Sequence, residues 1–387
     1  MKTSEEGKLP SPRYEISEAA LRRNLEILKE IKIRGNCKIV LALKGFSLFH
    51  TFPLIRQYLD GCCASGLWEA QLAQDEMGGD ILTYSPAYKD DDLAKLLEFS
   101  THLDFNSVSQ WRRFQEQALQ HPRYLSGELK LGLRINPEHS TGSTPLYDPC
   151  APGSRLGVTV EQLEGVDLEG LSTLHFHTLC EQNSDDLLTT INAVDEKFGH
   201  LLRQDQFTEL NLGGGHWITK PDYDRETLVE LLQHVRSKYK LEEVWLEPGE
   251  AVAIHTGNLV ASVLDLTKNG EVTNAILDVS ATGHMPDVLE MPYRPDVTGA
   301  GRPEEFQHTY RLGCPTCLAG DVIGDYSFEK PLEIGQELIF EDMAHYTMVK
   351  TTTFNGVQHP AIVILRENGG RRIVRQFTYD DFKQRLG

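Results

Sequence analysis

The chain has 387 residues, of which 40% are hydrophobic and 25% charged, and its formal net charge is −19 at pH 7. This length suits one large domain joined to a smaller one, and the composition is that of a globular enzyme. The acidic charge argues against a general nucleic-acid-binding protein, which needs a basic surface, but it is compatible with a cationic small-molecule substrate.

The amino-terminal residues 1–6 lack the apolar core of a signal peptide, and no apolar run is long enough to span a bilayer. We therefore expect a cytoplasmic protein that binds neither membranes nor nucleic acids. Cys314 and Cys317 have a C-x-x-C spacing, but no second pair of this spacing and no nearby histidines accompany them. A zinc site is therefore not expected, and the 7 cysteines are predicted to be free thiols.

Helical and strand-like segments alternate over residues 14–256. Residues 16–28 carry apolar side chains at helical spacing, with Ser17 as a plausible cap, and residues 38–43 predict a buried strand that ends at Lys44. The alternation predicts an α/β fold, a TIM-like (β/α)₈ barrel. Further helices are predicted at 51–59, 90–98, 184–198 and 225–239, and further strands at 81–84, 102–105, 130–135, 174–177, 209–212 and 243–247.

The pattern changes near Gly257, where strand-like segments begin to follow one another. Turns rich in Asn and Gly at residues 268–271 and 368–370 separate these segments. We therefore predict a second, antiparallel β domain over residues 257–387, to which residues 1–13 can be added. Its predicted strands are 260–266, 274–279, 337–340 and 361–365.

In a barrel of this type the active site lies at the carboxyl ends of the strands. Lys44 can supply an amine nucleophile there, and the glycines after Leu212 can bring backbone N–H groups to an anion such as phosphate. Each feature also has an ordinary structural explanation, because lysines often extend toward water at strand ends and glycines often mark turns. The residues at the predicted strand ends are Lys44, Arg134, His177, Gly213, Gly214, Gly215, Glu247 and Gly249.

Several spaced motifs carry a family resemblance: Ala42-Leu43-Lys44, Phe176-His177, 212–215, 247–249, 317–321, 340–343, Tyr346-Thr347 and 353–356. They resemble motifs of the barrel-type pyridoxal-phosphate decarboxylases in the alanine-racemase and ornithine/diaminopimelate-decarboxylase superfamily. The resemblance covers residues 14–382. Within that superfamily, the carboxynorspermidine (carboxyspermidine) decarboxylase branch is similar at residues 180–182, 214–216, 247–251 and 284–295.

This resemblance implies pyridoxal 5′-phosphate as the cofactor. Lys44 would bind the cofactor aldehyde covalently, Glu247 would keep the pyridine nitrogen protonated, and His177 would stack on the ring. The phosphate would meet the glycine turn and the Tyr346 hydroxyl. The implied cofactor site comprises Lys44, Arg134, His177, Gly213, Gly214, Gly215, Glu247, Gly249 and Tyr346.

The resemblance also implies that Cys317 protonates the substrate Cα. In this family the thiol comes from the partner subunit, so we expect a homodimer with shared active sites. Acidic side chains would hold the ammonium groups of a polyamine-precursor substrate, although such carboxylates are as commonly solvated loop residues. The residues expected to bind the substrate are Glu250, His284, Asp287, Glu290 and Asp321.

Two positions depart from the superfamily pattern. Glu250 stands where ornithine and diaminopimelate decarboxylases usually have an arginine, which removes one phosphate-binding cation. The adjacent Cys62 and Cys63 replace an Asp-Cys pair, which leaves Arg134 without one expected partner. Both departures are expected in the carboxynorspermidine branch.

The resemblance leaves three functions to compare. A diaminopimelate decarboxylase would need charged side chains, an arginine among them, to bind the distal carboxylate of its substrate. The uncharged Met285 and Leu318 stand at the corresponding positions. A non-catalytic pyridoxal-phosphate-binding homologue would tend to be the barrel alone. We therefore expect decarboxylation of carboxynorspermidine or carboxyspermidine in polyamine biosynthesis, two substrates that differ by one methylene.

Overall fold

The computed structural model describes residues 9–142 and 144–387, so the expectation for residues 1–6 lies outside the described part. The chain divides into two compact units. Arg22–Val252 form the first, and the residues up to Leu21 form the second together with Ala253–Gly387. Within the described ranges, no helix combines the length and the apolar character that a membrane crossing requires.

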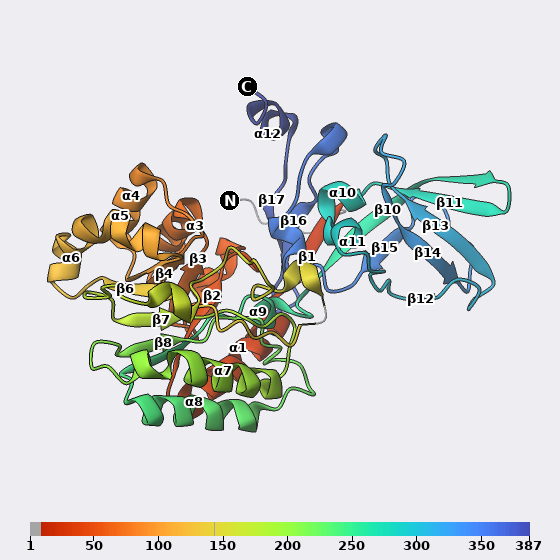
Figure 1. Ribbon diagram of the computed structural model, residues 1–387. Helices are drawn as coiled ribbons and strands as arrows, with labels where there is room; N and C mark the ends of the chain where they lie inside the picture. The colour runs from red at the N-terminus through yellow and green to blue at the C-terminus, as the bar shows by residue number, and fades with distance from the viewer. Residues whose placement is uncertain (1–8, 143) are drawn as a thin grey trace. The chain divides into compact units, whose positions relative to one another are not determined.

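The first unit is a closed barrel of eight parallel strands, which confirms the predicted (β/α)₈ fold (Figure 1). Each strand pairs with the next, and β9 pairs with β2 through Lys38–Trp245 and Ile39–Leu246. The strands are β2 (Lys38–Ala42), β3 (Gly61–Ala64), β4 (Asp80–Tyr84), β5 (His102–Phe105), β6 (Lys130–Arg134), β7 (Thr173–His175), β8 (Glu209–Asn211) and β9 (Glu243–Leu246).

Helices connect these strands. The predicted helix at 51–59 is shorter in the structure, where the 3₁₀ turn η1 (Phe49–Thr51) leads into α2 (Phe52–Ile55). The Ser17 hydroxyl accepts the Ala20 N–H at 3.2 Å, as expected of a cap. The other helices of this part are α1 (Glu18–Gly35), α3 (Leu67–Leu72), the π-helix η2 (Ala73–Met77), α4 (Asp90–Phe99), α5 (Val108–Leu119), α6 (Pro122–Leu125), α7 (Ser184–Leu202), α8 (Arg225–Tyr239) and α9 (Glu250–Ala253), with 3₁₀ turns η3 (Pro145–Tyr147) and η4 (Val160–Leu163).

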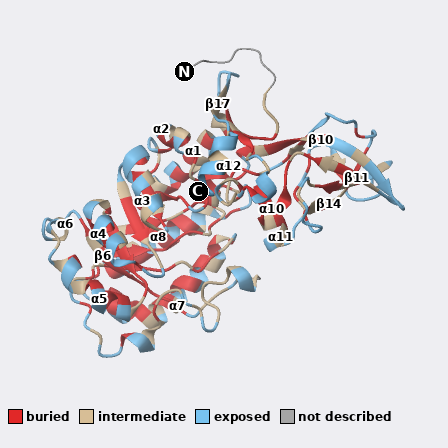
Figure 2. Cartoon of the chain, turned by 90° about the horizontal axis from the view of Figure 1, so that it is seen from above, coloured by how far each residue is buried: buried red, intermediate tan, exposed pale blue. Residues whose placement is uncertain are grey.

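The barrel strands are buried along most of their length, which Figure 2 shows as red ribbon through the barrel. Val40, Leu82 and Trp245 pack together in the interior, each with at most 3% of its surface exposed. Strands β5, β7 and β8 are buried at every residue. A parallel strand that is covered on both faces requires this continuous burial, so the polar residues on these strands need partners inside the protein.

The second unit is a nine-stranded sheet in the order β12-β14-β13-β11-β10-β1-β16-β17, with β15 paired to β10. It is mixed rather than purely antiparallel as predicted, because β1 pairs with β16 and β11 with β13 in parallel. The strands are β1 (Arg13–Ser17), β10 (Gly257–Asn269), β11 (Val272–Leu277), β12 (Ala300–Gly301), β13 (His308–Gly313), β14 (Val322–Phe328), β15 (Glu337–Phe340), β16 (Ala361–Leu365) and β17 (Arg371–Arg375), and the helices are α10 (Ala281–His284), α11 (Asp287–Glu290), α12 (Tyr379–Gln384), η5 (Thr347–Val349) and η6 (Phe354–Gly356).

The position of β1 differs from the predicted domain limits. The sequence-based barrel, residues 14–256, included this strand, whereas Tyr14 pairs with Leu259 of β10 and with Ile362 of β16. The helix that follows β1 hid the change of unit, because a strand followed by a helix is also the pattern of a barrel repeat.

Candidate active site

The turns after β2 and β9 pack against each other at the carboxyl end of the barrel. The Ala42 N–H donates to the Pro248 carbonyl at 3.0 Å. A Cβ on Gly45 would lie 3.0 Å from the Gly249 Cα, so both turns require glycine for their close approach. Lys44 lies in this contact with its side chain exposed. The structure therefore places the predicted amine beside the turn that carries the predicted carboxylate.

The three glycines after β8 form a tight turn. Gly213 and Gly215 have φ values of +70° and +85°, which glycine adopts without strain. A Cβ on Gly214 would lie 2.2 Å from the Glu247 carbonyl oxygen. The Gly213 N–H donates to Asn211 Oδ1 at 2.9 Å, and the Gly214 N–H donates to His177 Nδ1 at 2.8 Å. Two of the three amides expected to meet a phosphate therefore already have protein acceptors.

His177 is a neutral, hydrogen-bonded ring beside this turn. Desolvation lowers the pKa of His177 well below its ordinary value, and the positive charges of Lys44 and Arg134 lower it further. Its Nδ1 accepts the Gly214 N–H, which assigns the proton of the neutral ring to Nε2. A neutral imidazole can lie on an electron-poor aromatic ring without charge repulsion.

Glu247 is held by residues that the sequence did not reveal. Its Oε1 accepts from Asn211 Nδ2 at 2.7 Å, and its Oε2 lies 3.6 Å from His175 Nε2. His175 Nδ1 lies 2.9 Å from Asp104 Oδ2. The spacing along the strands could have indicated them, because alternate residues of a strand face the same side. His175 stands two residues before His177, and Asn211 stands two residues before the glycine turn.

Arg134 is buried at the end of β6, with 6% of its surface exposed. Its guanidinium donates to the His177 carbonyl at 3.1 Å and lies 4.5 Å from the centre of the Tyr84 ring. The aromatic face and the carbonyl thus take the place of the missing acidic partner. Glu250 is engaged too, since its Oε1 accepts from Trp217 Nε1 at 3.1 Å.

The other predicted site residues belong to the sheet unit. Cys317 is the exposed one of the seven free cysteines, and its N–H donates to Asn355 Oδ1 at 3.0 Å. Tyr346 immediately precedes η5 with a positive φ of 47°. His284 is fully buried, and burial lowers its pKa to about 3. A buried neutral ring of this kind is better suited to packing than to holding a cation.

The predicted substrate carboxylates have protein partners in this unit. Asp321, 3% exposed, accepts from Ser280 Oγ at 2.8 Å, from Thr316 Oγ1 at 2.5 Å and from the Thr282 N–H at 2.9 Å. Lys350 Nζ donates to a carboxylate oxygen of Asp287 and of Glu290, each at 2.5 Å. These contacts organise the loops around α10 and α11, so the roles of the three carboxylates in substrate binding stay predictions.

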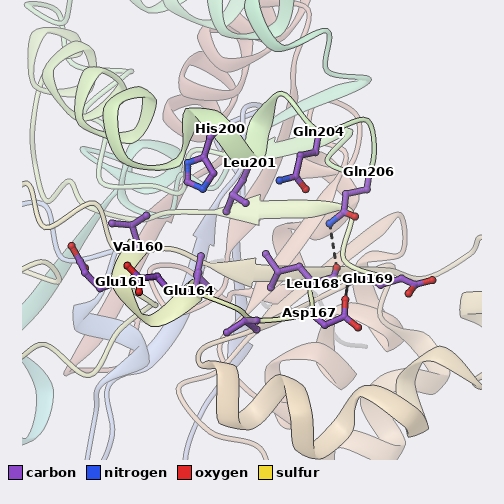
Figure 3. A pocket seen from close by; sticks show the side chains of 12 residues that line it. Val160, Glu161, Glu164, Asp167, Leu168, Glu169, His200, Leu201, Gln204 and Gln206 are labelled. Carbon is purple, nitrogen blue, oxygen red and sulfur yellow. Dashed lines mark hydrogen bonds between the residues drawn. The ribbon is translucent and has the colours of Figure 1, made fainter.

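A cavity of about 430 Å³ lies elsewhere on the barrel unit (Figure 3). Figure 3 shows Asp167, Leu168 and Glu169, which precede β7, opposite His200 and Gln204 from the end of α7 and its following turn. These segments lead into the amino-terminal ends of β7 and β8. The cavity is therefore at the opposite end of the strands from Lys44 and Glu247, where barrel enzymes do not place their chemistry.

The residues at the carboxyl end suit pyridoxal phosphate. An amine can bind an aldehyde, a half-buried carboxylate can pair with a pyridinium nitrogen, and a glycine turn admits a phosphate. Buried polar atoms without a hydrogen-bond partner among the described residues, such as Asp104 Oδ1 and both ring nitrogens of His175, lie behind that carboxylate. Such atoms are rare in folded proteins and common at functional sites.

Comparison with known proteins gives one consistent result. The profile of the "Pyridoxal-dependent decarboxylase, C-terminal sheet domain" family matches residues 52–344. The chain is 45% identical to a carboxyaminopropylagmatine decarboxylase of Synechocystis sp. over 98% of this chain and 96% of that protein. It is 41% identical to a carboxynorspermidine/carboxyspermidine decarboxylase of Campylobacter jejuni over 98% of this chain and 99% of that protein.

The solved structures agree with these relatives. The crystal structure of carboxynorspermidine decarboxylase from C. jejuni, complexed with norspermidine, has a TM-score of 0.89 and 40% identity, and the match covers 97% of this chain and 100% of that one. A diaminopimelate decarboxylase at 18% identity, with a TM-score of 0.81, shares the fold. This chain belongs to the pyridoxal-dependent decarboxylase family, whose cofactor is pyridoxal phosphate.

Proposed function

We propose that the protein decarboxylates carboxynorspermidine and carboxyspermidine in polyamine biosynthesis. The observation that carries the proposal is the convergence of the Lys44 turn, the glycine turn and Glu247 at the carboxyl end of the barrel. The full-length similarity to the C. jejuni enzyme supports the choice of substrate class.

The proposed roles follow from the chemistry of each side chain. Bound pyridoxal phosphate serves as an electron sink for the pair that remains on Cα when CO₂ departs. Lys44 anchors the cofactor aldehyde, Glu247 keeps the pyridine nitrogen protonated, and neutral His177 supports the ring. Arg134 stays in place beneath the site through the His177 carbonyl and Tyr84.

The phosphate is assigned to the glycine turn and to the Tyr346 hydroxyl. Because the Gly213 and Gly214 amides have protein acceptors, we assign the phosphate contact within the turn to Gly215. Gly249 contributes by admitting the Lys44 turn rather than by a contact of its own. Loss of the Tyr346 hydroxyl in Tyr346→Phe is expected to weaken cofactor binding, as measured by equilibrium dialysis.

We assign the proton that replaces CO₂ to Cys317 of a second copy of the chain, so that two copies share their active sites. Mixing Lys44→Ala and Cys317→Ala proteins under exchange conditions then restores up to about a quarter of the activity, since half of the random dimers carry one intact site. Mixtures that stay inactive would show that each chain builds its own site.

The distal arm of the substrate distinguishes two candidate functions. The 45% identity to the Synechocystis enzyme favours carboxyaminopropylagmatine as a second candidate substrate. Its agmatine part ends in a planar guanidinium, whereas carboxynorspermidine ends in an ammonium. A guanidinium is best bound by an acceptor that takes two parallel hydrogen bonds, such as a carboxylate. Asp287 and Glu290 can receive either cation only by exchanging their contact with Lys350.

The test compares kcat/KM for carboxynorspermidine, carboxyspermidine, carboxyaminopropylagmatine and meso-diaminopimelate. We expect the first two to differ by no more than about 200-fold, because one methylene is worth about 1–3 kcal/mol. A higher value for carboxyaminopropylagmatine would replace the first function by the second. A higher value for meso-diaminopimelate would overturn both.

A further inference from the structure

His175 lies between two carboxylates inside the barrel. It is the last residue of β7 and is 2% exposed. Its Nδ1 lies 2.9 Å from Asp104 Oδ2 and its Nε2 lies 3.6 Å from Glu247 Oε2. Neither contact is aligned as a hydrogen bond, so both ring nitrogens and Asp104 Oδ1 lack a hydrogen-bond partner within the described chain. Three buried polar atoms in one place require an explanation.

The Glu247 carboxylate is fixed at one oxygen and loosely approached at the other. Asn211 Nδ2 donates to Oε1 at 2.7 Å, while the same Asn211 side chain accepts the Gly213 N–H. The backbone N–H of Glu247 donates to the Gly213 carbonyl at 2.8 Å. The orientation of the carboxylate plane therefore depends on the contact between His175 Nε2 and Oε2.

The surrounding strands hold the imidazole and its acidic partner in place. The His175 ring meets the Tyr84 ring edge to face, with centroids 5.5 Å apart at an angle of 90°. Asp104 Oδ1 lies 2.0 Å from the position that a Cβ on Gly132 would occupy, so the glycine in β6 makes room for this carboxylate. The Tyr84 ring and Asp104 therefore restrict how the His175 ring can turn toward Glu247.

We propose that His175 is a positioning residue that, together with Asp104, directs the Glu247 carboxylate toward the pyridine nitrogen of the cofactor. Asn211 holds one carboxylate oxygen by a hydrogen bond and His175 approaches the other, while Asp104 keeps the imidazole turned toward Oε2. The inference rests on the proposed role of Glu247, through which His175 acts.

A double-mutant cycle tests the chain of contacts. We expect His175→Phe to raise the dissociation constant for pyridoxal phosphate by about tenfold, within the range for coupled neighbours, and to lower kcat with KM little changed. In the Glu247→Gln background the same change should have no further effect on cofactor affinity. Additive losses would overturn the inference, because they mean that His175 acts independently of Glu247.

The controls separate positioning from folding. His102→Phe removes another buried imidazole beside a carboxylate, Glu209, and should lower the melting temperature without changing the cofactor dissociation constant. His175→Gln, whose amide can still donate, should recover part of the affinity. If His175→Phe does not fold, Asp104→Asn enters the same cycle with the same expected coupling.

The outcomes also distinguish this inference from the function on which it rests. An unchanged cofactor affinity in Glu247→Gln contradicts the proposed role of Glu247. Weaker binding in Glu247→Gln with unchanged binding in His175→Phe contradicts the role of His175 alone.

Discussion

The two ends of the barrel carry similar sets of buried polar groups with opposite degrees of pairing. At the amino-terminal end, Glu209 accepts from His102 Nε2 at 2.8 Å, from Trp245 Nε1 at 3.0 Å and from Lys130 Nζ. Burial raises the pKa of Glu209, but its contacts with His102 and Lys130 outweigh burial and lower that pKa to about 2. This carboxylate is ionised and has a donor at each oxygen.

At the carboxyl-terminal end, the same kinds of side chain are left partly unpaired. His175 approaches Asp104 and Glu247 without an aligned hydrogen bond to either. The paired contacts around Glu209 stabilise the barrel, whereas the incomplete pairing around His175 leaves capacity for a ligand. Pairing, rather than the mere presence of histidines and carboxylates, therefore distinguishes the structural end from the functional one.

The largest expected effect comes from replacing the lysine at each end of the barrel by alanine and comparing the two variants. Lys44→Ala should lower kcat/KM by about a thousandfold or more and abolish the borohydride-reducible attachment of pyridoxal phosphate, with little change in melting temperature. Lys130→Ala should lower the melting temperature and leave the attachment intact. A normal yield of pyridoxyl-lysine from Lys44→Ala would contradict the assignment.

Removing the Glu209 charge at the amino-terminal end should lower the stability of the protein without lowering its catalytic rate. Glu209→Gln leaves the Lys130 ammonium, which is one third exposed, beside a neutral amide, and the lost hydrogen bonds to a buried charged carboxylate are worth about 1.5–3 kcal/mol. Denaturant unfolding measures the loss. The value of kcat per folded molecule should be unchanged, and a large fall in kcat would break the distinction between the ends.

The contribution of Glu209 should also appear in the pH dependence of the free energy of unfolding. The pKa of Glu209 in the folded protein, about 2, lies below its ordinary value of 4.5, so its contribution is complete above about pH 4.5 and is lost as the pH falls toward 2. A tenfold change in proton affinity is worth about 1.4 kcal/mol, which gives a contribution of about 3 kcal/mol. The unfolding free energies of the native protein and Glu209→Gln should converge over this pH range.

The smallest effect concerns the glycine turn. Gly214→Ala places a methyl group 2.2 Å from the Glu247 carbonyl oxygen, and such overpacking costs about 1–3 kcal/mol. We expect weaker cofactor binding, because the turn after β8 must shift. Gly66→Ala is the control, since nothing lies within 4 Å of its added methyl group. Equal behaviour of the two variants would mean that the turn tolerates displacement.

The sequence predicted the barrel because alternating helical and apolar segments are local signals. The strand β3, with the sequence Gly61-Cys62-Cys63-Ala64, escaped notice because it has neither branched nor aromatic residues. The membership of β1 in the sheet could not be inferred, since its partners Leu259 and Ile362 are distant along the chain. Local patterns predict elements, but long-range pairing decides which unit an element joins.

The residues of the site divide in the same way, into those with a local sequence signal and those without one. Lys44, His177 and Glu247 were predicted because they stand at strand ends, where barrel enzymes carry their chemistry. His175 and Asp104 lay inside the predicted strands 174–177 and 102–105, where a polar residue has no local signature of function, although β7 in fact ends at His175. Lys350 was missed because its contacts with two acidic residues join segments far apart in sequence.

The place of β1 in the sheet has a consequence for synthesis on the ribosome. This strand is made before the barrel, yet its parallel neighbour β16 emerges long after β10. At a translation rate of about 5–20 residues per second, the interval between the two neighbours is roughly 5 to 20 s. During it, β1 presents one open edge on the nascent chain. The charged Arg13 and Glu15 on this strand disfavour pairing with foreign strands until residues 361–365 arrive.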